Sequence, residues 1–189
     1  MENATRQTTA LRTLAINPGT REMGFAVLES TDLLYFGVHT FKHRQSVRSL
    51  LAEGHQFIQG LMDTFAPQVL VLEKTWYANS TRSAQLRGFV EAMQRSALRQ
   101  GLTVLVSTPT MVKKMLCGDG HVTKREVAET LVRQYYSYLA KYLRTDLRTR
   151  VRYWQHMFDA VALGLTGCEE ASKKRVPLTE GMKRRRQTR

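Results

Sequence analysis

The sequence lacks most of the features that mark secreted, membrane-bound or zinc-binding proteins. It has only two cysteines, Cys117 and Cys168, which lie too far apart for a zinc-binding pair, and we expect both to be reduced thiols without a function. No apolar run is long enough to cross a bilayer. Residues 1–13 are polar and contain no apolar block of the kind found in secretory signals. These absences predict a cytoplasmic protein without a membrane partner.

Acidic residues are also scarce, since 16 Asp and Glu stand against 29 Lys and Arg and leave a formal net charge of +13. Such a charge attracts polyanions, of which nucleic acid is the commonest. Residues 173–189 hold eight basic residues and one acidic residue, so they carry seven of these positive charges. A solvated basic tail explains that segment as well as DNA binding does, and charge alone therefore leaves the function open.

Apolar residues make up 42% of the 189 residues, and their spacing is typical of an α/β domain. Strands are predicted where apolar and β-branched residues form short runs, over 14–17, 24–29, 33–41, 69–72 and 102–107. Helices are predicted where apolar residues recur with helical periodicity, over 47–65, 81–100, 109–115 and 153–170. A further helix should begin after Thr123, because Glu126 follows it at capping-box spacing. The basic segment 140–151 is predicted to be a loop.

Three strands followed by alternating helices and strands predict an α/β fold with a mixed five-stranded sheet flanked by helices. We expect one domain over residues 14–170. A polar N-terminal extension precedes it at 1–13, and a basic C-terminal tail follows it at 171–189.

Four polar residues are predicted to meet at one edge of this sheet. Asn17 and Glu73 end two strands, and His156 and Asp159 share one face of the last helix because they are three positions apart. Each residue alone is better explained as a surface or capping residue. Together they resemble clusters that bind Mg²⁺ or Mn²⁺. Two such ions, about 4 Å apart, can activate water and stabilise the leaving oxygen in phosphodiester cleavage. His156 could bind Mn²⁺, bind through water, or transfer a proton.

Four sequence segments contain or flank these residues, and together they indicate a protein family more specifically than the single residues do. The first is LAINPGT at 14–20 with MGFAV at 23–27, and the second is VLE at 71–73 followed by Trp76. The third combines Val112, Lys113, Gly118, Gly120, Lys124 and Val127. The fourth is HMFDAVA at 156–162. In this order and spacing, from residue 14 to 170, they resemble the motifs of RuvC-type Holliday-junction resolvases, which are RNase H-like nucleases of the retroviral integrase superfamily.

The resemblance implies an RNase H-like fold and an endonuclease that resolves four-way DNA junctions. It implies that Mg²⁺, or Mn²⁺ in its place, is bound by a catalytic set made of Asn17, Glu73, His156 and Asp159. A four-way junction has two scissile strands related by a twofold axis, so a homodimer is expected, with its contact around the helix 81–100. DNA contacts are implied for two aromatic and four basic residues: Trp76, Tyr77, Lys113, Lys114, Lys124 and Arg125. Four arginines, at 144, 148, 150 and 152, fit either phosphate contacts or a solvated loop.

One departure from the family pattern bears on activity, because the family carries Asp where this chain has Asn17. An amide offers a neutral oxygen where a carboxylate offers a charge that can bridge two ions. We therefore expect weaker metal binding and impaired cleavage. Asn17 is either an engineered inactivating change or the residue of a naturally impaired homologue. Two other functions remain open: a junction-binding module that does not cut, and a nuclease of this fold that acts on flaps or RNA–DNA hybrids.

Overall fold

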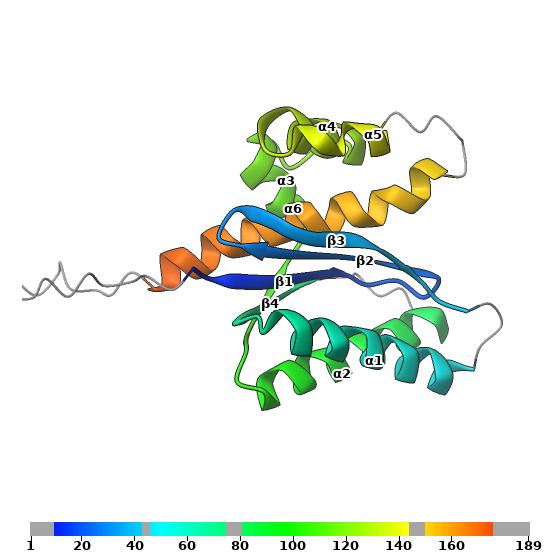
Figure 1. Cartoon of the computed structure of the whole chain (residues 1–189). Coiled ribbons are helices and arrows are strands. Elements are labelled where there is room, and N and C mark those ends of the chain that lie inside the picture. The colour runs from blue at the N-terminus through cyan, green and yellow to red at the C-terminus, as the bar shows by residue number, and fades with distance from the viewer. Residues whose placement is uncertain (1–9, 43–45, 75–80, 144–149, 176–189) are drawn as a thin grey trace, which may run out of the picture.

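The computed structural model describes residues 10–42, 46–74, 81–143 and 150–175. Five strands form one sheet in the spatial order β3-β2-β1-β4-β5 (Figure 1). In chain order they are β1 (Arg12–Asn17), β2 (Glu22–Glu29), β3 (Asp32–Thr40), β4 (Val69–Glu73) and β5 (Thr103–Ser107). The β1–β2 and β2–β3 pairs are antiparallel, whereas the β1–β4 and β4–β5 pairs are parallel. The predicted mixed five-stranded sheet is confirmed.

Helices cover both faces of the sheet (Figure 1). One face carries α1 (Val47–Phe65) and α2 (Thr81–Arg99), and the other is crossed by α6 (Arg150–Arg175). Against α6 pack α3 (Pro109–Cys117), α4 (Lys124–Gln134) and α5 (Ala140–Leu143), the last preceded by a 3-10 turn (Ser137–Leu139). No helix in the described part of the chain is long and apolar enough to span a bilayer.

Strand alternation divides the core into two layers. Leu14, Ile16 and Leu70 belong to the cluster shared with α1 and α2, whereas Ala15 and Val71 belong to the cluster shared with α6. Successive residues of a strand point to opposite faces, so each buried strand needs apolar residues throughout. This is why the runs at β1 and β4 are continuously apolar.

The edge at which β1 and β4 end positions the site. Ile16 stands opposite Leu72 in this parallel pair, so Asn17 and Glu73 follow at the same edge. Gly24 lies opposite Asn17 on β2, and a Cβ there would come within 1.7 Å of the His156 carbonyl oxygen. The missing side chain therefore lets the α6 backbone rest directly on β2, which brings His156 and Asp159 to the ends of β1 and β4.

The predicted loop 140–151 and the end of the last helix differ from the structure. The predicted loop 140–151 is wrong at both ends, because Ala140–Leu143 is helical and α6 already begins at Arg150. Tyr142 and Leu143 pack against the core cluster on the α6 side, which the surrounding basic residues concealed in the sequence. The last helix also continues to Arg175 instead of ending at Glu170, since Ala171 is buried in that cluster and extends the contact by a turn.

Candidate active site

Asn17 is the centre of a hydrogen-bonded group at the end of β1. Its side chain is buried, with 5% of the residue exposed. The Nδ2 amide donates to Oε2 of Glu73 at 2.5 Å, and Oδ1 lies 2.8 Å from Nδ1 of His156. An amide oxygen can only accept, so Nδ1 of His156 is the donor in this pair. Three of the four predicted site residues are thus joined directly, from two strands and one helix.

Asp159, the fourth residue, is engaged through both of its carboxylate oxygens. Oδ2 accepts from the Lys124 ammonium at 2.5 Å, and Oδ1 accepts from Nε2 of Gln155 at 2.9 Å. The Asp159 side chain is only 10% exposed, whereas that of Lys124 is 56% exposed. Lys124 is held in place because it opens α4, whose start is fixed by the predicted capping box of Thr123 and Glu126.

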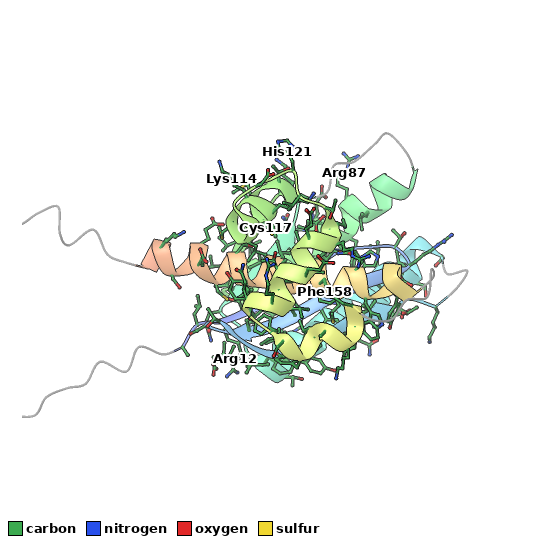
Figure 2. The ribbon with its side chains drawn as sticks, turned by 90° about the horizontal axis from the view of Figure 1, so that it is seen from above. Arg12, Arg87, Lys114, Cys117, His121 and Phe158 are labelled. Carbon is green, nitrogen blue, oxygen red and sulfur yellow. The ribbon has the colours of Figure 1, made fainter. Side chains whose placement is uncertain are left out.

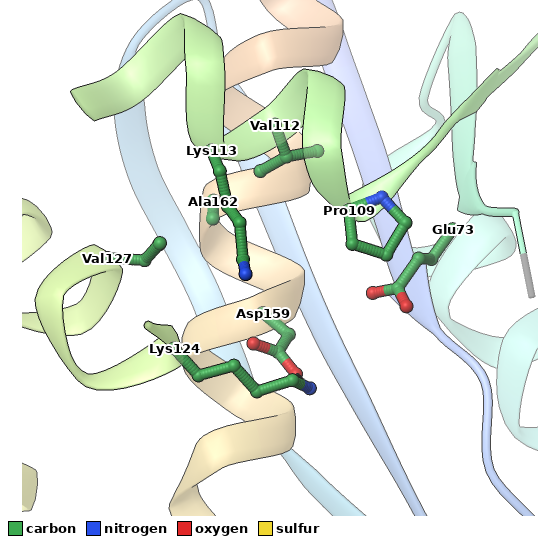
Figure 3. A pocket seen from close by; sticks show the side chains of 8 residues that line it. All are labelled: Glu73, Pro109, Val112, Lys113, Lys124, Val127, Asp159 and Ala162. Carbon is green, nitrogen blue, oxygen red and sulfur yellow. Dashed lines mark hydrogen bonds and ion pairs between the residues drawn. The ribbon is translucent and has the colours of Figure 1, made fainter. Parts of the chain in front are cut away.

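A small pocket of about 30 Å³ joins these groups (Figure 3). Glu73, Lys124 and Asp159 line it together with Lys113, which extends into it from α3. The remaining lining is apolar and consists of Pro109, Val112, Val127 and Ala162. The pocket therefore places two carboxylates and two ammonium groups within a space suited to water or an ion.

The electrostatics of the site follow from burial and from this mixture of charges. Burial raises the pKa of Glu73, and the charge of Asp159 adds to the effect, while Lys124 and the Asn17 hydrogen bond oppose it. Burial lowers the pKa of His156, although the charges of Asp159 and Glu22 act in the other direction. Burial also acts to lower the pKa of Lys124, but the charges of Asp159 and Glu73 outweigh it, so this pKa is raised.

Two residues of the site were missed in the sequence. Oε2 of Glu22 lies 3.7 Å from Nε2 of His156, and Gln155 binds Asp159 as described above. Alternation along β2 puts Glu22 on the same face as Gly24, which packs against His156, and this was the signal that could have found it. Gln155 precedes Asp159 by four positions, a spacing that brings side chains together on a helix.

The predicted DNA-contacting residues fall into three groups. Lys113 and Lys124 line the pocket, whereas Lys114 and Arg125 do not. Lys114 lies in the last turn of α3 (Figure 2), and Arg125 pairs with Glu129 at 2.8 Å. Outside the described residues lie Trp76, Tyr77, Arg144 and Arg148. Arg150 and Arg152 begin α6. Both cysteines are free thiols, partly buried at 117 and buried at 168.

The donor groups fit a hard divalent cation, but only in part. Carboxylate and amide oxygens are the ligands that Mg²⁺ and Mn²⁺ prefer, and Glu73, Asp159 and Asn17 supply them. Among the described residues, however, no three His, Cys, Asp or Glu side chains are close enough to hold an ion. Asn17 stands between Glu73 and His156 and presents an N–H donor to Glu73. A metal ion cannot bind at a donor hydrogen, so the bridging carboxylate of a two-ion centre is missing.

Comparison with known protein sequences identifies one family. Residues 13–166 match the family described as crossover junction endodeoxyribonuclease RuvC. The RuvC of Roseiflexus sp. is 30% identical over 126 residues, which are 64% of this chain and 75% of that protein. The RuvC of Methylobacillus flagellatus is 31% identical over 132 residues, 65% of this chain and 73% of that protein.

Solved structures agree with the architecture. The Thermus thermophilus RuvC structure superposes with a TM-score of 0.69 at 22% identity and covers 87% of this chain and 97% of that one. The same protein in complex with a Holliday junction substrate gives a TM-score of 0.68 at 20% identity, over 86% and 96% of the two chains. At these identities the likeness shows the fold, so the predicted RNase H-like architecture is confirmed.

Proposed function

Because the chain belongs to the RuvC family of crossover junction endodeoxyribonucleases, we propose that it binds four-way DNA junctions and cuts them at the site around Asn17. The observation that carries this proposal is the meeting of Glu73 from β4 and Asp159 from α6 in one pocket with Lys113 and Lys124. Two carboxylates suit a catalytic cation, and two ammonium groups suit a phosphate. Nucleases of this family are metal-dependent, and Mg²⁺, or Mn²⁺ in its place, is the ion that the oxygen ligands favour.

Each side chain has a separate task in this scheme. Glu73 and Asp159 would hold a divalent ion, which would supply activation of water and charge stabilisation at the phosphate. Lys113 neutralises the phosphodiester as it enters the pocket. Burial lowers the pKa of His156, which favours the neutral imidazole. Because Nδ1 donates to Asn17, Nε2 has the free lone pair and can accept a proton there.

Asn17 makes this a weakened centre. In place of a carboxylate that would repel Glu73 and attract metal, the amide forms a hydrogen bond that is satisfied without metal. We expect cutting to be slow as a result. The same observation favours the second candidate function, a module that binds junctions and does not cut. The two candidates differ only in whether any metal-dependent cleavage remains.

DNA is expected to lie across the surface that α3 and α4 present. Lys113, Lys114, Lys124 and Arg125 come from these two helices. They can neutralise several phosphates, which makes affinity fall steeply with salt. Trp76 and Tyr77 follow Glu73 in the chain, and their stacking on unpaired bases at the branch point stays a prediction.

The twofold symmetry of a four-way junction also supports a homodimer, with α2 as its expected contact. The apolar stripe of α2 is already used inside the chain, because Phe89, Val90 and Met93 are buried against α1 and the sheet. A dimer contact would therefore involve the outer face of α2, where Leu98 is 60% exposed. A cytoplasmic location beside the DNA of its host remains a prediction.

The proposal is tested by comparing substrates. In the presence of a chelator, the purified chain should bind a four-way junction more tightly than a duplex of the same sequence, and both affinities should fall with salt. After addition of Mg²⁺ or Mn²⁺, slow symmetric cuts near the branch point are expected, and Asp159→Asn should remove them while keeping the binding. Junction binding without cuts at any metal concentration would favour the non-cutting module. Preference for flaps or RNA–DNA hybrids would overturn the proposed substrate.

A further inference from the structure

Lys124 occupies a place in the pocket where a cation is expected. Its ammonium lies 2.5 Å from Oδ2 of Asp159, although the two residues are 35 positions apart in the chain. The two helices that carry them, α4 and α6, pack directly on each other. Figure 3 shows the end of Lys124 beside the Asp159 carboxylate, on the side of the pocket that Glu73 lines.

The same ammonium also acts on Glu73. The charge of Lys124 lowers the pKa of Glu73, and the charge of Glu73 raises the pKa of Lys124, so each is within electrostatic reach of the other. One positive group therefore serves both carboxylates of the pocket. The Lys124 side chain is 56% exposed, so water screens part of its attraction to Asp159, whose side chain is only 10% exposed.

The number of negative charges around the pocket limits how many cations it can hold. Glu73 and Asp159 carry one each, and Asn17 adds none. Two divalent ions would bring four positive charges to two carboxylates, beside the ammonium groups of Lys113 and Lys124 that already line the pocket. One divalent ion together with these ammonium groups is a closer match to the two carboxylates and an incoming phosphate.

We propose that Lys124 provides one of the positive charges of this centre, so that the chain binds a single divalent ion and Lys124 competes with that ion for Asp159. The inference rests on the proposed function and specifies its metal content. The two-ion arrangement expected from the sequence would then apply only to a chain in which residue 17 is a carboxylate.

Mn²⁺ binding to the full-length protein tests the inference without DNA and without an activity assay. Free Mn²⁺ has a sharp electron paramagnetic resonance signal that is lost on binding, so a titration gives both the number of sites and their affinity. The unsubstituted chain with Asn17, here called wild type, should saturate at one ion, and Asn17→Asp should saturate at two. Lys124→Met should still bind one ion, but about tenfold or more tightly, because the direct competitor for Asp159 is gone.

Lys113→Met is the matched control, since it removes the same charge from the same pocket but from a residue that does not bind Asp159. Its effect on Mn²⁺ affinity should be clearly smaller than that of Lys124→Met. Asp159→Asn should abolish the site, which separates it from weak binding elsewhere, and thermal unfolding should show that every variant is folded. Any of three outcomes would overturn the inference. The wild type could bind two Mn²⁺ ions, neither the wild type nor Lys124→Met could bind Mn²⁺, or the two lysine variants could change the Mn²⁺ affinity equally.

Failure of this inference can be distinguished from failure of the proposed function. A chain that cuts junctions but binds two Mn²⁺ ions keeps the function and loses the role of Lys124. A chain that binds one ion in competition with Lys124 but does not recognise junctions keeps that role and loses the function.

Discussion

Gly24→Ala should move the helix that carries half of the candidate site. An added Cβ would lie 1.7 Å from the His156 carbonyl oxygen, 2.3 Å from the carbonyl carbon and 3.0 Å from the Met157 nitrogen. A carbon and a carbonyl oxygen normally stay at least about 3.3 Å apart, so the α6 backbone would have to retreat by roughly 1.5 Å. All three neighbours are backbone atoms of a helix, which cannot rotate away as a side chain can.

Both stability and catalysis should suffer from this shift. Overpacking a core costs about 1–3 kcal/mol, and the upper end applies here because no flexible group can yield. His156 and Asp159 move with α6, whereas Glu73 stays on the sheet. A displacement of about 1 Å in a catalytic site can lower the rate about 100-fold. We expect that loss for junction cleavage, measured in the Asn17→Asp background.

Gly60→Ala is the control, because a Cβ at this position in α1 meets nothing within 4 Å. It should stabilise the protein by about 0.5–1 kcal/mol, since alanine favours helix over the unfolded chain. Urea unfolding of both variants gives the two free energies. If Gly24→Ala unfolds at the same urea concentration as the wild type and cuts at the rate of its parent, the close contact between α6 and β2 is not what positions the site.

Three further predictions follow from single residues. Glu73→Gln should abolish metal-dependent cutting but raise the free energy of unfolding at pH 7. Burial raises the pKa of Glu73, so the folded state disfavours the ionised carboxylate at a pH above its ordinary pKa. Unchanged cutting by this variant would show that the centre is wrongly assigned. Burial also raises the pKa of Tyr136 above its ordinary 10.0, so the folded chain keeps a proton that the unfolded chain loses, and stability should fall as pH rises above that value. Tyr136→Phe should flatten this alkaline decline and cost about 1 kcal/mol at neutral pH through the lost hydrogen bond to the Thr31 carbonyl, as pH-dependent urea unfolding will show. Trp76→Ala in the Asn17→Asp background should slow junction cutting with little change in melting temperature. Unstacking raises the fluorescence of 2-aminopurine placed at the branch point, and this increase should be lost with the Trp76→Ala protein. An equal signal from the proteins with and without Trp76→Ala would make Trp76 a packing residue.

Most of the fold could be predicted from local sequence patterns. The helical period of α1 and the continuous apolar runs of β1 and β4 each depend on neighbouring residues, so they could be predicted without knowing the tertiary structure. Asn17 and Glu73 could be placed together because parallel strands end at the same edge of a sheet. His156 and Asp159 share a helix face for an equally local reason.

The contacts that set the charge of the site were not predictable in this way. Lys124 was expected to bind DNA phosphate, and its ion pair with Asp159 exists only because α4 packs on α6. The donor role of the Asn17 amide depends on which groups surround it, namely a carboxylate on one side and an imidazole on the other. Gly24 was visible as part of a motif, but its contact with the α6 backbone is a tertiary feature.

The most direct test of the whole account is junction cleavage by Asn17→Asp compared with the wild type, at equal occupancy of a four-way junction and over a range of Mg²⁺ concentrations. A carboxylate at this position should increase the cleavage rate by about 100-fold or more, since even residues that only support metal ligands change activity by 10- to 100-fold. It should also lower the Mg²⁺ concentration needed for half-maximal cutting. If Asn17→Asp is folded, binds the junction as tightly as the wild type and remains inert in Mg²⁺ and in Mn²⁺, the pocket formed by Glu73, Asp159 and Lys124 is not a nuclease centre.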